Sequence, residues 1–169
     1  MLQVVTRTSY FLLCKYILSF KQVSLLILLG TIANYNIRPI FARDNSKIVV
    51  DKNTVNQTIA VSGTSGGTVE ALEITKTKNT PTGYCHGFVN SQPNHFLEID
   101  TFFENLKLEI ESLADTTVLV KGDRGIWCND DAGSANPMIQ GQWQPGIYQV
   151  WVGSYQPDSK DSYQLKITN

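Results

Sequence analysis

The feature that most constrains the fold is a two-residue alternation of apolar and polar side chains along the second half of the chain. It is clearest in residues 105–113, where Leu106, Leu108 and Ile110 alternate with charged side chains. Successive side chains of a strand point to opposite faces, so this pattern predicts a strand with one buried and one solvated face. Similar runs predict further strands at residues 58–62, 68–75, 95–101, 116–121, 146–153 and 162–168.

Turn-forming residues separate these runs. Clusters of Gly, Pro, Asn, Asp and Ser occur at residues 62–67, 79–83, 122–125 and 130–137, among other places. Short strands with a turn signal about every eight to twelve residues are typical of an all-β sandwich or barrel. The sequence therefore predicts one all-β domain of antiparallel strands with a single core.

The first 42 residues differ in composition from the rest of the chain. They hold an apolar run at residues 23–32, basic residues before it, and no Asp or Glu. The run is shorter than the roughly 20 residues that span a bilayer. It predicts a secretory signal cleaved after Ala33 or Ala42, with an uncleaved membrane anchor as the alternative. We therefore expect a secreted, periplasmic or extracellular protein. The predicted segments are a signal or anchor at 1–42, a short lead-in at 43–52 and the domain at 53–169.

The charge of the chain restricts its partners. Residues 43–169 carry ten basic and fifteen acidic side chains. A surface that binds nucleic acid needs an excess of Lys and Arg, so this balance argues against a nucleic-acid partner. The length of 169 residues leaves room for one modest domain besides the leader.

Two cysteines, Cys85 and Cys128, lie outside the leader. An even pair in an exported chain favours a disulfide. The alternative is a zinc site that adds His86 and His95 to the two cysteines. Adjacent ligands such as Cys85 and His86 rarely both reach one ion, and the chain has no C-x-x-C pair, so the disulfide is the stronger prediction.

The run GTSGG at residues 63–67 matches the G-x-S-x-G pattern of serine hydrolases. A nucleophilic serine needs a histidine base and an acid that orients it. Both histidines, His86 and His95, follow Ser65, which excludes the chymotrypsin-like order. The chain also lacks the alternating strands and helices of α/β-hydrolases. The run therefore predicts a turn whose glycines adopt positive φ angles.

The acidic run Asn129, Asp130 and Asp131 supplies oxygen ligands of the kind that Ca²⁺ prefers. It does not have the spacing of an EF-hand loop. The same residues also suit a solvated turn in which the Asx side chains cap their own backbone. Both interpretations stay open for this loop.

Several Trp and Tyr residues are candidates for a ligand surface, because their rings stack on sugars or anchor protein partners. Trp151 lies between the inward-facing Val150 and Val152, so it should point to the opposite face of its strand. If that face is open, Trp151 is exposed and can bind a ligand together with Tyr155. For the set as a whole, core packing is the stronger prediction. The set comprises Tyr84, Trp127, Trp143, Trp151 and Tyr155.

Short motifs spread along the chain form a recognisable set. They lie at residues 61–67, 83–88, 92–95, 112–117, 127–131, 136–137 and 145–153. This set resembles secreted, mostly cyanobacterial proteins related to the bacterial pre-peptidase C-terminal domain. The resemblance covers nearly all of residues 53–169 and implies an exported, jelly-roll-like β-sandwich, usually an accessory module of secreted hydrolases. Relatives include collagen-binding modules that hold calcium, and this implies calcium ligands at Asp115, Asn129, Asp130 and Asp131.

Taken together, the sequence favours a secreted, non-catalytic binding module, because no complete catalytic set is present. Its expected ligand is a carbohydrate or a protein at the cell surface, with calcium as a structural ion. The alternative is a small secreted hydrolase, or an accessory subunit of a secreted peptidase, that uses Asp115, Asp130 and Asp131.

Overall fold

The structure, a computed structural model, describes residues 46–54 and 56–169. Within these ranges no helix is long and apolar enough to cross a membrane. The predicted signal or anchor at 1–42, with its cleavage sites after Ala33 and Ala42, lies outside the described residues.

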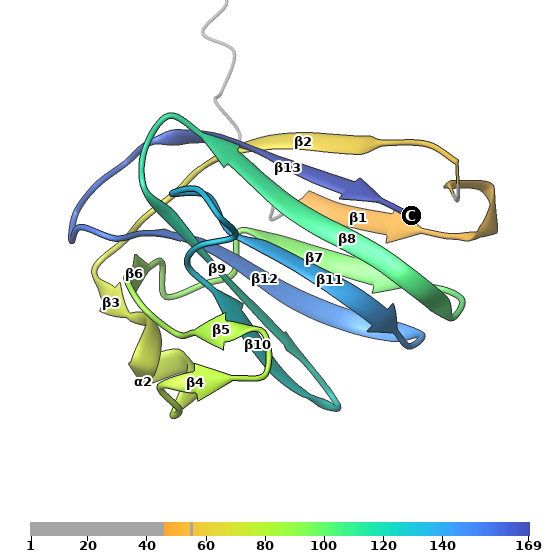
Figure 1. The fold of residues 1–169 in the computed structure, drawn as a ribbon, viewed down its shortest axis with the longest axis horizontal. Coiled ribbons are helices and arrows are strands. Elements are labelled where there is room, and N and C mark those ends of the chain that lie inside the picture. The colour runs from red at the N-terminus through yellow and green to blue at the C-terminus, as the bar shows by residue number, and fades with distance from the viewer. Residues whose placement is uncertain (1–45, 55) are drawn as a thin grey trace, which may run out of the picture. The chain divides into compact units, whose positions relative to one another are not determined.

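The described residues form a sandwich of two sheets, as the alternating pattern predicts. The elements in chain order are β1 (Ser46–Val50), the 3-10 helix η1 (Lys52–Thr54), β2 (Ile59–Thr64), β3 (Val69–Glu70), α2 (Ala71–Thr75), β4 (Asn79–Thr80), β5 (Gly83–Tyr84), β6 (Phe88–Val89), β7 (His95–Ile99), β8 (Phe103–Ser112), β9 (Thr116–Gly122), β10 (Gly125–Asn129), β11 (Met138–Trp143), β12 (Gly146–Ser154) and β13 (Ser162–Thr168). Figure 1 shows one layer made of β11, β8, β13 and β2, and a second layer that contains β1, β7, β12, β9 and β10. The described part of the chain thus has an all-β fold with little helix.

In the larger sheet, β12 is the central strand. Its residues 149–154 pair with β9 along one edge, and its residues 146–150 pair with β7 along the other. β10 extends the sheet beyond β9 through a hairpin at residues 123–124, within the predicted turn. All strand pairs among the described residues are antiparallel except that of β1 with β7.

The space between the sheets is filled by the apolar positions of the alternating runs. Leu106, Leu108 and Ile110 of β8 are at most 1% exposed, as predicted. They belong to one cluster with inward-facing side chains of the other strands, such as Leu97 and Leu165. Burial of one such side chain contributes about 1.5 to 3 kcal/mol, so this cluster is the main source of stability.

A second apolar cluster lies on the outer face of the larger sheet. It consists of Ala71, Cys85, Val89, Leu119, Cys128 and Trp151. In Figure 1 the elements from β3 to β6, with α2, gather at one end of the molecule near β9 and β10. This segment covers part of the outer face, so residues 150–154 of β12 are all buried. Continuous burial of this kind is typical of a strand that is covered on both faces.

The strand predicted at residues 68–75 is formed only at its start. Two residues make β3, and the chain then enters the short helix α2. The helix buries Ala71 and Thr75, which lie four residues apart on one helical face. The Thr75 hydroxyl donates a hydrogen bond to the Ala71 carbonyl at 3.1 Å. The prediction was wrong here because the buried positions follow a helical spacing and not a period of two.

Residues 46–50, which were assigned to a lead-in at 43–52, form an edge strand of the larger sheet. β1 runs parallel to β7, with Ile48 opposite Leu97. Ile48 and Val50 are buried in the core between the sheets. The lead-in prediction was wrong because these apolar side chains gain their burial from a strand far along the chain. Among the described residues, the sandwich therefore begins with β1, and the division of the chain into segments stays a prediction.

Candidate functional site

A shallow groove of about 820 Å³ lies where the segment around β4 and β5 meets the residues that follow β10. Its lining residues are Lys78, Asn79, Thr82, Gly83, Tyr84, His86, Asn129, Asp130, Asp131 and Tyr155. The side chains of Tyr84 and Tyr155 are 59% and 50% exposed. The groove therefore joins the predicted acidic run to two of the predicted aromatic residues. We call it the tyrosine groove.

The strand register explains why residues distant in sequence meet at this groove. Ser154 at the end of β12 lies opposite Thr116 at the start of β9. Asn129 at the end of β10 lies opposite Val118 of β9. These pairings place three residues at the same end of the larger sheet: residue 115 just before β9, residue 130 just after β10 and residue 155 just after β12.

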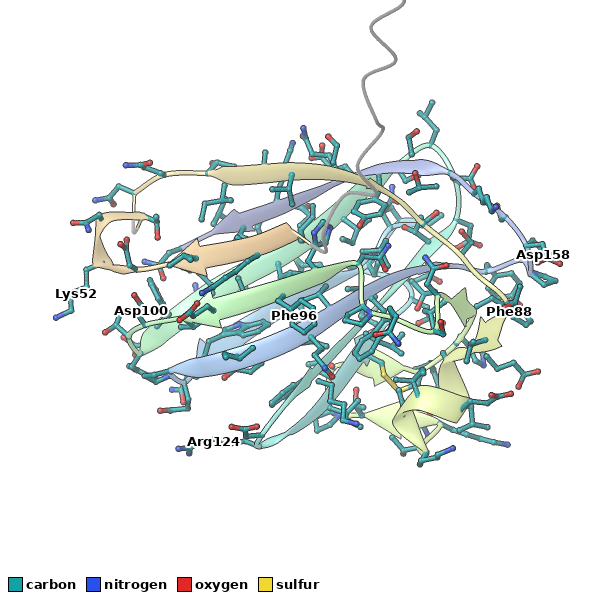
Figure 2. The ribbon with its side chains drawn as sticks, turned by 180° about the vertical axis from the view of Figure 1, so that it is seen from behind. Lys52, Phe88, Phe96, Asp100, Arg124 and Asp158 are labelled. Carbon is teal, nitrogen blue, oxygen red and sulfur yellow. A yellow bond between two sulfur atoms is a disulfide. The ribbon has the colours of Figure 1, made fainter. Side chains whose placement is uncertain are left out.

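The disulfide Cys85–Cys128 joins the two walls of the tyrosine groove, as predicted. It is drawn as a yellow bond in Figure 2. The Cα atoms of the pair are 5.1 Å apart, and both cysteines are buried. Their neighbours Tyr84, His86 and Asn129 line the groove. The zinc alternative does not hold, because the two sulfur atoms are bonded to each other.

Hydrogen bonds also hold the two walls together. The Thr82 hydroxyl donates to the Cys128 carbonyl at 2.8 Å, and the Cys128 N–H donates to the Thr80 hydroxyl at 3.0 Å. The Asn129 side chain donates to the Thr82 carbonyl at 2.8 Å and accepts from the Met138 N–H at 3.1 Å. Asn129 is buried, and both polar atoms of its side chain are engaged. Asn129 therefore has a structural role, and its role as a calcium ligand stays a prediction.

His86 lies in ring contact with both exposed tyrosines. Its ring is 5.8 Å from that of Tyr84, nearly parallel, and 6.5 Å from that of Tyr155, edge to face. Its Nδ1 is 3.5 Å from a carboxylate oxygen of Asp130. His86 was predicted only as a ligand in the zinc alternative, and its place between two exposed tyrosines was not foreseen. The available signal was its spacing, because Tyr84 and His86 flank the buried Cys85 and so point to the same side of an extended segment.

Three carboxylates, set against the one ammonium group of Lys78, leave an excess of negative charge at the tyrosine groove. Asp130 and Asp131 line it, and Asp115 is close enough to interact with both. Partial burial, together with repulsion from Asp131 and Asp130, raises the pKa of the Asp115 carboxyl above its ordinary value. Within residues 46–54 and 56–169, no three His, Cys, Asp or Glu side chains are grouped to hold a metal ion. Calcium at Asp115, Asp130 and Asp131 stays a prediction.

Replacing Asp115 with Asn is expected to raise the melting temperature slightly at neutral pH when divalent ions are removed. The ionised carboxylate is disfavoured in the folded state because its pKa is raised there. This penalty is complete above the raised folded pKa and vanishes as the pH falls below the ordinary value of 3.8. Melts of wild type and D115N in a chelator, from neutral pH to about pH 3, measure the difference. A variant that melts below wild type at every pH would contradict this expectation.

The same melts with excess calcium test the calcium prediction. A cation present at 100 times its Kd adds about 2.7 kcal/mol to the stability of the folded state. Wild type is then expected to melt several degrees higher, and D115N, which lacks one ligand, should gain less. Asp100→Asn is the matched control, because Asp100 is exposed and does not line the groove. An unchanged wild-type melt would sink the calcium idea.

Trp151 is not part of the tyrosine groove. It points away from Val150 and Val152, as predicted, but its side chain is only 4% exposed. It packs in the second cluster, under the segment that runs from β3 to β6. The condition for its exposure, an open outer face, is not met, because the cover comes from residues far away in sequence. For Trp151, core packing therefore holds and the predicted ligand role does not.

Ser65 has a structural role. Its side chain is 2% exposed, and its hydroxyl lies 2.9 Å from the Ser154 hydroxyl and donates to the Asp161 carbonyl at 3.1 Å. Neither partner is a histidine. The segment 63–67 leads from β2 of one sheet to β3 of the other, and Gly66 has a φ of 86°, as the predicted turn requires.

Comparison with known proteins assigns this chain to no family. No family model matches it. Over 86 residues it is 27% identical to an uncharacterized protein of Synechococcus elongatus, a match that covers 48% of this chain and 63% of the relative. The chain thus spans less than two thirds of that relative's length.

Two solved structures are similar at a low level. One is the pre-peptidase C-terminal domain of a collagenase from Bacillus anthracis, with a TM-score of 0.41 and 13% identity over 75% of this chain and 98% of that chain. The other is CorA, a surface-associated copper-binding protein of Methylomicrobium album, with a TM-score of 0.34 and 11% identity over 73% of this chain and 97% of that chain. The resemblance to pre-peptidase C-terminal domains therefore stays a prediction.

Proposed function

We propose that this protein is a non-catalytic binding module that recognises a basic segment of a partner protein in the tyrosine groove. The observation that carries the proposal is the contact of His86 with both Tyr84 and Tyr155, beside Asp130 and Asp131. Exposed tyrosine rings and carboxylates together suit Lys and Arg side chains, through cation–π contacts and ion pairs.

The electrostatics of the groove favour a positively charged ligand. The Asp115 carboxyl is held under repulsion by Asp131 and Asp130, and a bound cation would relieve that repulsion. Residues 43–169 also carry more acidic than basic side chains, so the domain attracts a basic partner from a distance. Salt screens such attraction, and binding should therefore weaken as the ionic strength rises.

The groove is held in shape before the ligand arrives. The Cys85–Cys128 disulfide and the bonds of Thr82 and Asn129 fix the backbone on both sides. A site that is already ordered loses less conformational entropy when it binds its ligand. Surface tyrosines add to this advantage, because they bring a large contact area with few rotatable bonds.

Tyr84→Ala is expected to weaken the binding of a hexalysine peptide about tenfold. Loss of an interface tyrosine typically costs one to two kcal/mol, and about 1.4 kcal/mol corresponds to that factor. Tyr155→Ala should have a similar effect. Phe102→Ala is the matched control, because Phe102 is 47% exposed but does not line the groove. Isothermal titration calorimetry with hexalysine, at low and at high salt, measures the affinities.

Equal affinity of wild type and both tyrosine variants for hexalysine would contradict the proposal. A chitosan oligomer tests whether the positive charge of the ligand comes from an amino sugar. If the protein binds chitosan but not hexalysine, the partner is a carbohydrate and not a protein. The Asp130→Asn, Asp131→Asn double variant separates binding from the hydrolase alternative. Loss of hexalysine affinity in that variant supports binding, whereas loss of a hydrolytic turnover that wild type possesses would favour the enzyme.

A further inference from the structure

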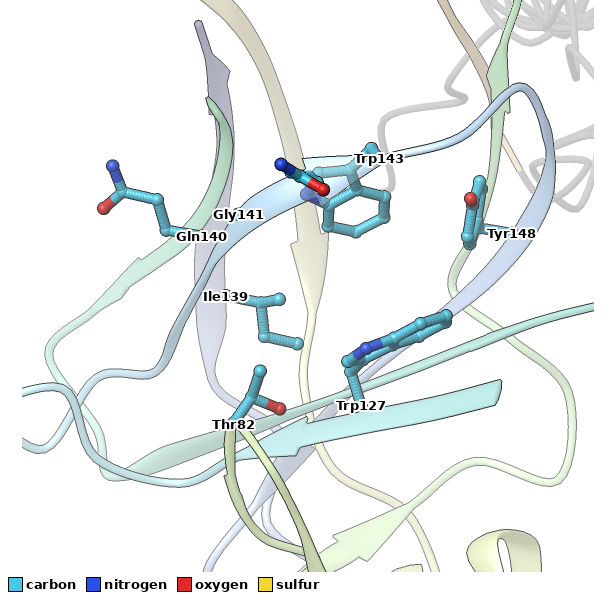
Figure 3. A pocket seen from close by; sticks show the side chains of 8 residues that line it. Thr82, Trp127, Ile139, Gln140, Gly141, Trp143 and Tyr148 are labelled. Atoms are coloured by element: carbon cyan, nitrogen blue, oxygen red, sulfur yellow. The ribbon is translucent and has the colours of Figure 1, made fainter. Parts of the chain in front are cut away.

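A second, smaller pocket opens between the two sheets, where β10 and β11 form neighbouring edges (Figure 3). Its volume is about 180 Å³. Ligand pockets for drug-sized molecules usually measure about 300 to 1,000 Å³, so this pocket fits only one small ring of a larger ligand. It differs from the tyrosine groove in position and in chemistry, although Thr82 lies on the wall of both. We call it the edge pocket.

Three aromatic rings from three strands form the apolar side of the edge pocket. Trp127 of β10 and Trp143 of β11 are stacked, with ring centroids 6.4 Å apart at 30°. Tyr148 of β12 is 5.1 Å from the Trp143 ring and 6.1 Å from the Trp127 ring. Aromatic walls of this kind bind the flat apolar face of a ring-shaped ligand.

Two of these rings are fixed by hydrogen bonds, and the third keeps its donor available. The Trp143 indole N–H donates to the Leu106 carbonyl at 3.0 Å, and the Tyr148 hydroxyl donates to the Gln144 carbonyl at 2.8 Å. Among residues 46–54 and 56–169, none accepts a hydrogen bond from the indole N–H of the half-buried Trp127. Trp127 therefore offers a ligand both a ring face and a hydrogen-bond donor.

The remaining lining of the edge pocket consists of the apolar Ile139, Gly141 and three polar, uncharged side chains. Thr82, Gln140 and Gln142 contribute hydroxyl and amide groups, and none of the described residues that line the pocket is charged. At Gly141 no atom lies within 4 Å of the place where a Cβ would stand, so the mouth is open on this side. An uncharged pocket offers no ion pair that would offset the free energy lost when a charged ligand leaves water. Its ligand should therefore be neutral, with one apolar face and several hydroxyl groups.

We infer that the edge pocket binds one sugar ring of a neutral polysaccharide. The apolar face of the ring packs on Trp127, and the ring hydroxyls bond with Gln140, Gln142 and the Trp127 indole. Because the mouth of the pocket is open at Gly141, the rest of the polysaccharide chain can continue into solvent on that side. This inference does not depend on the function proposed for the tyrosine groove.

Affinity gel electrophoresis of the protein in a panel of neutral glucans tests the inference. The panel contains hydroxyethyl cellulose, laminarin, dextran and soluble starch, and at least one is expected to retard wild type. Trp127→Ala should reduce the affinity for that glucan at least tenfold, and Gln142→Ala several-fold. Gln156→Ala is the matched control for the second variant, because Gln156 is also exposed but does not line the pocket. Tyr84→Ala should leave glucan binding unchanged.

Two results would overturn the inference. One is the absence of retardation in every glucan of the panel. The other is full glucan affinity in both Trp127→Ala and Gln142→Ala. Because Trp127 packs against the core, its variant could lose binding by unfolding, and a melt of each variant is therefore recorded. Gln142 is exposed, so its variant should melt at the same temperature as wild type. If Trp127→Ala does not fold, the result for Gln142→Ala decides.

Discussion

The Cys85→Ser, Cys128→Ser double variant is expected to lose about 4 kcal/mol of unfolding free energy. The two cysteines are 43 residues apart in sequence, and a cross-link over a loop of this length restricts the unfolded chain by about that amount in the loop-entropy model. For a domain of this size the loss corresponds to a melting temperature roughly 15 °C lower. The sandwich itself should still fold, because the cluster between the sheets contains neither cysteine.

The same variant is expected to lose its affinity for hexalysine. Tyr84 and His86 flank Cys85, so without the disulfide their wall of the tyrosine groove is held to β10 mainly by the hydrogen bonds of Thr80 and Thr82. Urea unfolding gives the stability, and calorimetry with hexalysine gives the affinity. Wild type in a reducing agent should behave like the variant, and the variant itself should not respond to the reducing agent. A variant with wild-type stability and affinity would show that the disulfide does not support the groove.

The second large effect is expected for Gly66→Ala, at about 2 to 4 kcal/mol. Gly66 has a φ of 86°, which costs a residue with a side chain about 1 kcal/mol. An added Cβ would also stand 1.9 Å from the carbonyl oxygen of Ser159. That oxygen belongs to the backbone, so relief requires a shift of the chain, and overpacking of this kind costs about 1 to 3 kcal/mol more.

Gly133→Ala is the matched control for this prediction. Gly133 has nearly the same φ, 82°, but no atom lies within 4 Å of the place of its Cβ. This variant should therefore lose only the conformational part, about 1 kcal/mol. Urea unfolding of the two variants and wild type measures both losses. Equal stability of the two variants would show that a Cβ at residue 66 causes no steric conflict with the backbone of Ser159.

The buried faces of the main strands could be predicted from the sequence. In β8, for example, every second residue from Leu106 to Ile110 is buried, because a strand alternates its side chains between two faces whatever its neighbours are. The disulfide could also be predicted from the sequence, since only Cys85 and Cys128 lie outside the leader. These features follow from rules that act over a few residues or from a simple count.

The tyrosine groove could be predicted only in its parts. Asp130, Asp131 and Tyr155 were recognised as candidates, but their meeting depends on the pairing of β9 with both β10 and β12. His86 joins them because its neighbour Cys85 is bonded to Cys128 at the end of β10. No local pattern encodes such a meeting, because strand register results from contacts across the whole sheet.

The outer face of the larger sheet shows most clearly which features a local sequence pattern cannot predict. The alternation was sufficient to orient Trp151 away from the core between the sheets, and the structure agrees. Whether that face is open or covered depends on the segment that runs from β3 to β6, about 60 to 80 residues earlier in the chain. Side-chain direction within a strand follows from backbone geometry. Burial depends instead on which distant segment packs on that side. That packing is driven by the burial of apolar surface over the whole fold, which no local pattern reports.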